Sequence, residues 1–136
     1  MAYLIKAEVN DPRADTFSFT ALKTMYGGKH IAVGDTVYVF ASENEGGQGL
    51  VARGVVSAAR ATPKPRGVER VTPRVGITVI RTARAKLPLG RSDFKPFGDW
   101  NDDRAETELK FKFYRHATNK IGGISDKAAE FIEKYF

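Results

Sequence analysis

The middle of the chain carries the residues best suited to bind a charged ligand. Between positions 60 and 91, nine lysines and arginines stand against a single acidic residue, a net charge of +8, whereas the segments on either side each carry −1. Seven of the nine are arginine, whose planar guanidinium can hold a phosphate through two hydrogen bonds. The pattern predicts a phosphate-contacting segment. Its expected contacts are Arg60, Lys64, Arg66, Arg70 and Arg74.

A second interpretation of this segment stays open on the sequence alone. Pro63, Pro65, Gly67 and Pro73 interrupt it, as they would interrupt a solvated basic loop with no ligand. The net charge of +6 for the whole chain favours the first interpretation, with nucleic acid, either DNA or RNA, as the partner.

Aromatic residues form a second group that could contact a ligand. Phe94, Phe97 and Trp100 fall between positions 87 and 104, a stretch without hydrophobic periodicity that is expected to be an ordered loop. Their rings either cover one end of the core or form a stacking wall for an unpaired base.

Catalytic and metal-binding signatures are missing from the sequence. There is no cysteine, and His30 and His116 are the two histidines, so thiolate zinc sites and cysteine nucleophiles are excluded. The glycines at positions 46, 47 and 49 lack the Lys-Ser/Thr ending of a phosphate loop and are expected to form a hairpin turn. We therefore expect no catalytic residues, no metal and no cofactor.

The elements that position these groups follow from hydrophobic spacing. Alternation and β-branched runs predict strands over 3–9, 36–42, 50–58, 74–84 and 109–115, with a bulge or close approach at Gly54. Three-and-four spacing predicts a helix that starts at Thr16 or Ser18 and ends before Gly27, and a second helix capped by Ser125. Positions 119–123 are expected to form a turn.

Together these elements predict an α+β fold, a small mixed β-barrel of five or six strands with flanking helices, as one domain over 1–136. No crossover helices separate the central strands, which excludes a doubly wound sheet. The first nine residues lack the apolar segment of a signal peptide, and no apolar run reaches eighteen residues. We expect a cytoplasmic protein without a membrane partner.

Two segments carry a resemblance to a known family. The run Gly34 to Ser42, GDTVYVFAS, followed by Gly49 to Val56, GLVARGVV, resembles the EVE domain of the PUA-like superfamily, which is related to the YTH and ASCH domains. In that family a Gly-Asp turn leads a strand that ends in an aromatic-x-Ser step, which Ser42 matches. The resemblance implies a PUA-like barrel whose pocket binds a nucleobase, often a modified one, in DNA or RNA.

The sequence thus predicts a nucleic-acid-binding module that recognises a modified base. The nucleobase pocket is expected to combine aromatic walls with polar groups at element ends: Tyr38, Phe40, Ser42, Arg53, Phe97, Trp100 and Asn119. The ASCH relatives imply an alternative, a small amidohydrolase acting on a modified nucleoside, with Lys23 beside Glu43 and Thr20. A third possibility is a protein-interaction module with an aromatic patch.

Overall fold

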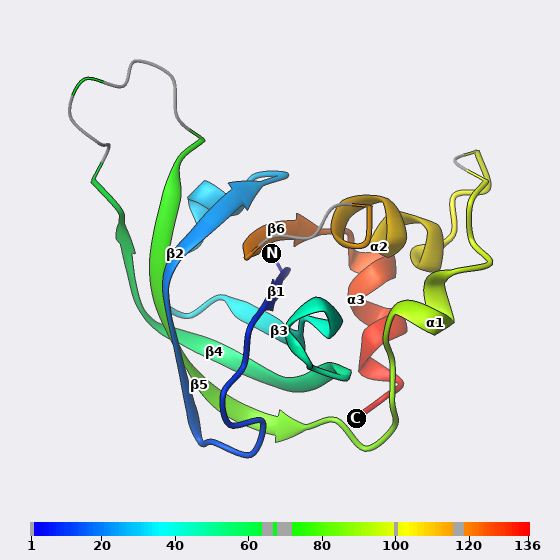
Figure 1. Ribbon diagram of the computed structural model, residues 1–136, viewed down its shortest axis with the longest axis horizontal. Helices are drawn as coiled ribbons and strands as arrows, with labels where there is room; N and C mark the ends of the chain where they lie inside the picture. Colours follow the sequence, from blue (N-terminus) through cyan, green and yellow to red (C-terminus); the bar gives the residue numbers. More distant parts are fainter. Residues whose placement is uncertain (1, 64–66, 68–71, 100, 116–118) are drawn as a thin grey trace.

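The computed structural model describes residues 2–63, 67, 72–99, 101–115 and 119–136 (Figure 1). In the described part of the chain, six strands close into a barrel in the order β1-β3-β4-β5-β2-β6. The strands are β1 (Ala2–Ala7), β2 (Thr16–Met25), β3 (Thr36–Ala41), β4 (Gly49–Ala61), β5 (Arg74–Arg84) and β6 (Lys120–Ile124). The expected α+β barrel is confirmed.

Three helices lie on one side of this barrel, to the right in Figure 1: α1 (Arg91–Phe94), α2 (Ala105–Phe113) and α3 (Asp126–Glu133). Two single 3-10 turns, η1 (Gly28–His30) and η2 (Glu43–Glu45), complete the set. No helix among the described residues is long and apolar enough to cross a membrane.

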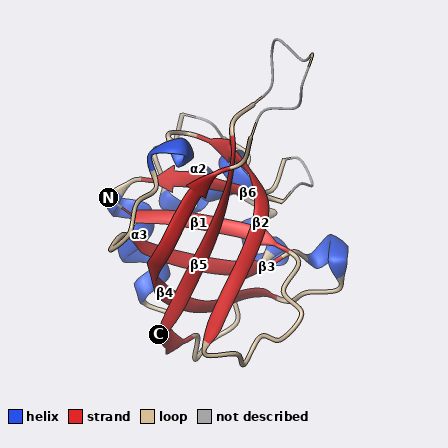
Figure 2. Cartoon of the chain, turned by 90° about the vertical axis from the view of Figure 1, so that its left-hand side faces the viewer, coloured by secondary structure: helices blue, strands red, loops and turns tan. Residues whose placement is uncertain are grey.

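The barrel is mixed because β1 runs parallel to β3 and β2 runs parallel to β6, while its other neighbouring pairs are antiparallel. Strands β4 and β5 are the longest of the barrel and lie side by side (Figure 2). The expected irregularity at Gly54 is confirmed, since the β4–β5 register shifts between Arg53 and Gly54. A Cβ at position 54 would lie 2.4 Å from Cγ1 of Val79, so the close approach requires glycine.

Two hydrophobic cores lie on opposite faces of the same strands. The core inside the barrel includes Ile5, Val37, Val39, Val79 and Ile121. The core between the barrel and the helices includes Leu4, Phe40, Leu109, Phe113 and Ile132. Strands β1 and β3 supply both cores and are buried on both faces, which explains their almost unbroken apolar sequences.

The C-terminal helix α3 forms where its spacing predicts. Oγ of Ser125 accepts a hydrogen bond from the backbone N of Ala128 at 3.1 Å, the expected N-cap. Ala128 and Ile132, four residues apart, are buried against the barrel.

The predicted strand over 109–115 is wrong, because this segment contains most of α2. Leu109 and Phe113 are buried and lie four residues apart, which places them on one face of a helix, whereas Phe111 is only half-buried. The short run from Leu109 to Phe113 fits both the two-residue period of a strand and the 3.6-residue period of a helix. Packing against the barrel favours the helix.

The predicted first helix is also wrong, because residues 16–25 form β2. Its register shifts between Phe19 and Leu22, so a β-bulge breaks the alternation in the middle of the strand. Phe19, Leu22 and Met25 stand three residues apart and imitate a helical stripe, whereas the buried residues of the strand are Phe17, Leu22 and Thr24.

The predicted turn over 119–123 is strand β6, whose residues are all buried. Gly122 serves close packing, because a Cβ there would lie 3.2 Å from both the Met25 carbonyl oxygen and the Phe113 ring. The expected loop over 87–104 includes the short helix α1, in which Phe94 is buried.

Gly49 offers a test of this architecture. It has a φ of +88°, and a Cβ there would lie 2.2 Å from the carbonyl oxygen of Leu89. Gly34 has a similar φ of +95° but open space around it. We expect Gly34→Ala to cost about 1 kcal/mol of unfolding free energy through backbone strain alone, and Gly49→Ala about 3 kcal/mol through strain plus overpacking. Urea denaturation measures both, and equal losses would contradict the close approach.

Candidate functional site

Cross-strand register aligns four basic residues into a row across four strands of the barrel. Arg74 of β5 pairs with Lys23 of β2. Lys23 pairs with Lys120 of β6, and Lys120 pairs with Lys6 of β1. Residues that pair directly across strands place their side chains on the same face of a sheet. We call Arg74, Lys23, Lys120 and Lys6 the basic row.

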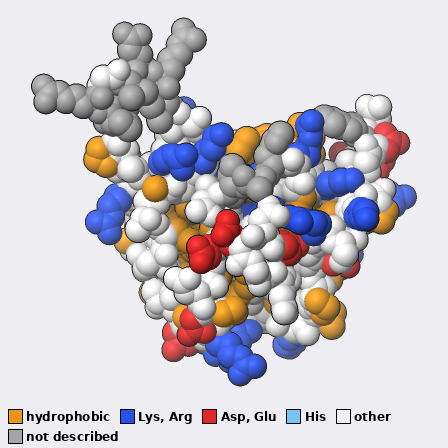
Figure 3. All heavy atoms as spheres, viewed as in Figure 1, with side chains coloured by type: hydrophobic (Ala, Val, Ile, Leu, Met, Phe, Trp, Pro, Cys, Tyr) orange, Lys and Arg blue, Asp and Glu red, His pale blue; other side chains and the backbone are white. Residues whose placement is uncertain are grey.

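The row lies on the outer face of the barrel, because the residues beside its members point inward. These inward residues all belong to the core inside the barrel: Ile5, Leu22, Val75 and Ile121. On the face shown in Figure 3, basic side chains are spread from the base of the β4–β5 hairpin to α2, with acidic side chains between them.

Lys6 forms the most buried end of the row. Its side chain is 1% exposed, and its Nζ donates a hydrogen bond of 3.0 Å to the backbone oxygen of Phe113, at the end of α2. The same Nζ lies 4.1 Å from the centre of the Tyr114 ring. Burial lowers the pKa of Lys6, and the negative charge of Glu43 opposes that shift.

Lys120 lies beside it and is 2% exposed, with its Nζ 5.8 Å from the centre of the Phe113 ring. Burial, followed by the positive charges of Lys6 and Lys23, lowers the pKa of Lys120 to about 8. An anion near this amine would favour its charged form. The buried end of the row therefore places two amines close together, at Lys6 and Lys120.

The row opens to solvent at its other end. Lys23 is half-buried and Arg74 is exposed, with Nη1 of Arg74 donating a hydrogen bond of 2.9 Å to the backbone oxygen of Ala21. Arg60 is exposed on β4 and pairs with Gly76, two residues from Arg74. Two of the five predicted phosphate contacts, Arg60 and Arg74, thus lie close together at the open end of the row. Lys64, Arg66 and Arg70 lie outside the described residues.

Two predicted pocket residues flank the row. Asn119 is exposed beside Lys120, and its backbone oxygen accepts a hydrogen bond of 2.9 Å from the N–H of Lys23. Ser42 is buried next to the inner end, where its N–H donates to the oxygen of Ala7 at 2.8 Å.

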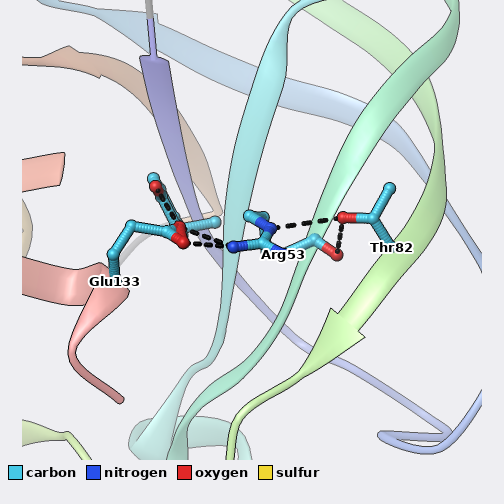
Figure 4. Close-up of polar contacts among 4 residues, drawn as sticks. Arg53, Thr82 and Glu133 are labelled. Atoms are coloured by element: carbon cyan, nitrogen blue, oxygen red, sulfur yellow. Dashed lines mark hydrogen bonds and ion pairs between the residues drawn. The ribbon is translucent and has the colours of Figure 1, made fainter. Parts of the chain in front are cut away.

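Tyr38 and Arg53 lie in a different place. Both contact Glu133 of α3: the hydroxyl of Tyr38 donates to it at 2.7 Å, and the Arg53 guanidinium forms an ion pair with it (Figure 4). Burial and the bond to Glu133 raise the pKa of Tyr38. This network joins α3 to β3 and β4.

Among the described residues, the aromatic side chains predicted for the pocket lie in different environments. Phe40 is completely buried in the core under the helices, so its ring is closed to a base. Phe97 lines a separate cleft beside α2, with the Arg104 guanidinium 5.8 Å from its ring centre. Trp100 lies outside the described residues, and the stacking wall that includes it stays a prediction.

The sequence reasoning overlooked Lys6 and Lys120, although Lys6 leaves a trace in the sequence. It is the charged residue within Tyr3 to Ala7, an otherwise apolar strand, and a charge at such a position indicates a buried polar contact. Lys120 lies within the segment 119–123 that is expected to form a turn, so its burial becomes visible only once β6 is recognised.

The amidohydrolase alternative requires Lys23, Glu43 and Thr20 to lie together, and the structure places them apart. Register places Lys120 and Lys6 between Lys23 and the region of Glu43. Glu43 instead accepts hydrogen bonds from the Tyr114 hydroxyl at 3.3 Å and the Arg91 N–H at 2.6 Å. Thr20 lies in the bulge of β2, where its backbone oxygen accepts from Thr62.

The closed six-strand barrel with helices over one side is a fold that this chain shares with two solved structures. The human THYN1 protein, in its crystal structure with DNA containing 5-methylcytosine, superposes with a TM-score of 0.64 at 10% identity, covering 98% of this chain and 95% of that one. The DUF55 domain of human thymocyte nuclear protein 1 gives 0.61 at 11% identity, with 98% and 97% covered. No protein-family model and no curated protein sequence matches the chain.

The pKa of Lys120 predicts a pH-dependent stability. The group titrates at about 8 in the folded chain against an ordinary 10.5 in the unfolded one, so unfolding free energy rises with pH between these values. Lys120→Met keeps the side-chain length without the charge. Its stability relative to wild type should be higher at pH 7 than at pH 9.5 by about 2 kcal/mol, at roughly 1.4 kcal/mol per pKa unit.

Urea denaturation of both proteins at the two pH values measures this difference, and any packing change cancels in the comparison. Lys29→Met, at an exposed position of η1, is the control and should show no such dependence. A difference that is the same at both pH values would mean that the Lys120 amine is charged without penalty.

Proposed function

We propose that this protein binds nucleic acid at the basic row and recognises a modified base there. The register that aligns four basic side chains across β5, β2, β6 and β1 is the observation that carries the proposal. The row also continues beyond the β4–β5 hairpin to Lys23, Lys120 and Lys6 on three other strands, which a solvated basic loop does not explain.

The two ends of the row have different tasks in this proposal. Arg74, Arg60 and Lys23 at the open end contact backbone phosphates directly, as exposed or half-buried cations. Lys6 and Lys120 act at a distance, since charges in a low-dielectric interior are weakly screened and raise the potential of the surface nearby.

Base recognition is assigned to the polar groups beside the row. Asn119 is exposed next to Lys120, and an amide both donates and accepts hydrogen bonds, as the edge of a base requires. Fold likeness supports a modified base as the target, because a structural neighbour that covers nearly the whole chain is a complex with DNA containing 5-methylcytosine.

Fluorescence anisotropy with labelled duplex DNA tests the phosphate contacts. Lys23→Gln/Arg74→Gln removes two contacts and should weaken binding at least tenfold and lower the salt slope by about 2, at roughly 0.9 per phosphate. Lys29→Gln/Lys127→Gln has the same change in net charge elsewhere and is the control. If both double variants lose affinity equally, binding depends on net charge and the proposed site is wrong.

Base recognition is tested with paired probes that differ only in one methyl group on cytosine, in duplex and single-stranded DNA and in RNA of the same sequence. We expect wild type to prefer one methylated probe, and Asn119→Ala to lose that preference while its affinity for the unmethylated probe stays within twofold. A wild-type protein that binds methylated and unmethylated probes equally in every format would contradict modified-base recognition.

A further inference from the structure

A second group of basic side chains lines a cleft between the β4–β5 ribbon and the end of α3. Its volume is about 580 Å³, and its lining includes Arg53, Arg81, Arg84, Lys86, Glu133 and Phe136. Arg81 follows Arg74 by seven positions along β5, which corresponds to about 23 Å of strand at 3.3 Å per residue. The cleft is therefore separate from the basic row.

The cleft has more positive charge than its carboxylates balance. Four of its lining residues are basic and one, Glu133, is acidic; Asp15 pairs with Arg81 from outside the lining. Within the described part of the chain, Arg84 and Lys86 form no ion pair within 4 Å. Arg84 donates to the backbone oxygen of Arg13 at 3.1 Å, which leaves its charge uncompensated.

Arg53 is a third guanidinium group in the cleft, and it already forms an ion pair with Glu133. The Glu133 carboxylate pairs with the guanidinium of Arg53, whose Nε contacts the Thr82 hydroxyl at 3.3 Å (Figure 4). The ring of Phe136 lies 5.2 Å from the same guanidinium. Arg53 is thus fixed in place by three contacts, and the position of its anionic partner is taken by Glu133.

We propose that this cleft is a binding site for a phosphate group carried on a larger molecule, either a free nucleotide or a nucleic-acid backbone. Three guanidinium forks and a lysine match the geometry and charge of a phosphate better than those of a neutral ligand. The cleft is much larger than a phosphate ion, which favours a phosphate ester. Arg84 and Lys86 supply the uncompensated charge, and Glu133 competes with the ligand for Arg53.

Because Glu133 competes with the ligand for Arg53, substitutions in this cleft should change ligand affinity in opposite directions, which a purely structural ion pair would not cause. Arg84→Gln/Lys86→Gln should weaken phosphate binding at least tenfold. Glu133→Gln removes a negative charge from the cleft and frees Arg53, so it should tighten binding severalfold. Two changes in one cleft are thus expected to act in opposite directions, and the pair Lys29→Gln/Lys127→Gln should leave this binding unchanged.

Isothermal titration with pyrophosphate, a nucleoside monophosphate and a short duplex identifies the source of the phosphate, and amide NMR shifts at Ala83, Ala85 and Lys86 locate the binding. Binding of the small probes would identify nucleotides as ligands. Binding of the duplex alone, lost in Arg84→Gln/Lys86→Gln, would identify a backbone contact.

The proposal is overturned if none of the three probes shifts these amides, or if Glu133→Gln binds more weakly than wild type while remaining folded by circular dichroism. The test does not depend on the basic row, because Lys23→Gln/Arg74→Gln should keep the NMR shifts at the cleft. Failure at the row and failure at the cleft are therefore distinguishable.

Discussion

A buried hydrogen bond joins the barrel to its helical layer: the amine of Lys6 donates to the backbone oxygen of Phe113, where α2 ends. The terminal carbonyls of a helix lack intrahelical partners and carry partial negative charge, so a cation there both caps the helix and finds a counter-charge. This contact fixes the end of α2 over β1. It also explains how a lysine that is 1% exposed is tolerated in the core.

The register that places Lys6 under α2 also places Lys120 directly beside it. Burial is the main reason that the pKa of Lys120 is depressed, and the positive charges of Lys6 and Lys23 depress it further. The same pairing continues outward through Lys23 to Arg74, so a packing contact at one end and an exposed cation at the other belong to a single row.

Several elements could be predicted from local sequence because their signals are local. The strand from Thr36 carries unbroken β-branched and aromatic residues, and Ser125 caps a helix with a clear apolar stripe. The errors arise where tertiary packing decides. The spacing of Leu109 and Phe113 fits a strand as well as a helix, and packing against the barrel decides for the helix. In β2, the β-bulge interrupts the alternation that would indicate a strand.

The residues of the candidate site also fall into those that the sequence predicts and those that only the tertiary structure shows. Arg60 and Arg74 were predicted from charge density and lie together at the base of the β4–β5 hairpin, because neighbouring positions in a hairpin follow from sequence. Tyr38 and Phe40 were expected in a pocket because they are aromatic, yet burial places Phe40 wholly in a core. Lys6 and Lys120 are 114 positions apart in the sequence, and the β1–β6 pairing that joins them leaves no local signal.

If nucleic acid binds along the basic row, its phosphates act on the Lys120 amine at the buried end of the row. An NMR titration of the Lys120 Nζ, with and without saturating duplex DNA, tests this most directly. We expect a pKa of about 8 in the free protein and a rise of at least one unit in the complex, because bound phosphates favour the charged amine. A Lys120 pKa that stays the same when DNA binds would show that the row is part of the barrel's structure and not of a nucleic-acid site.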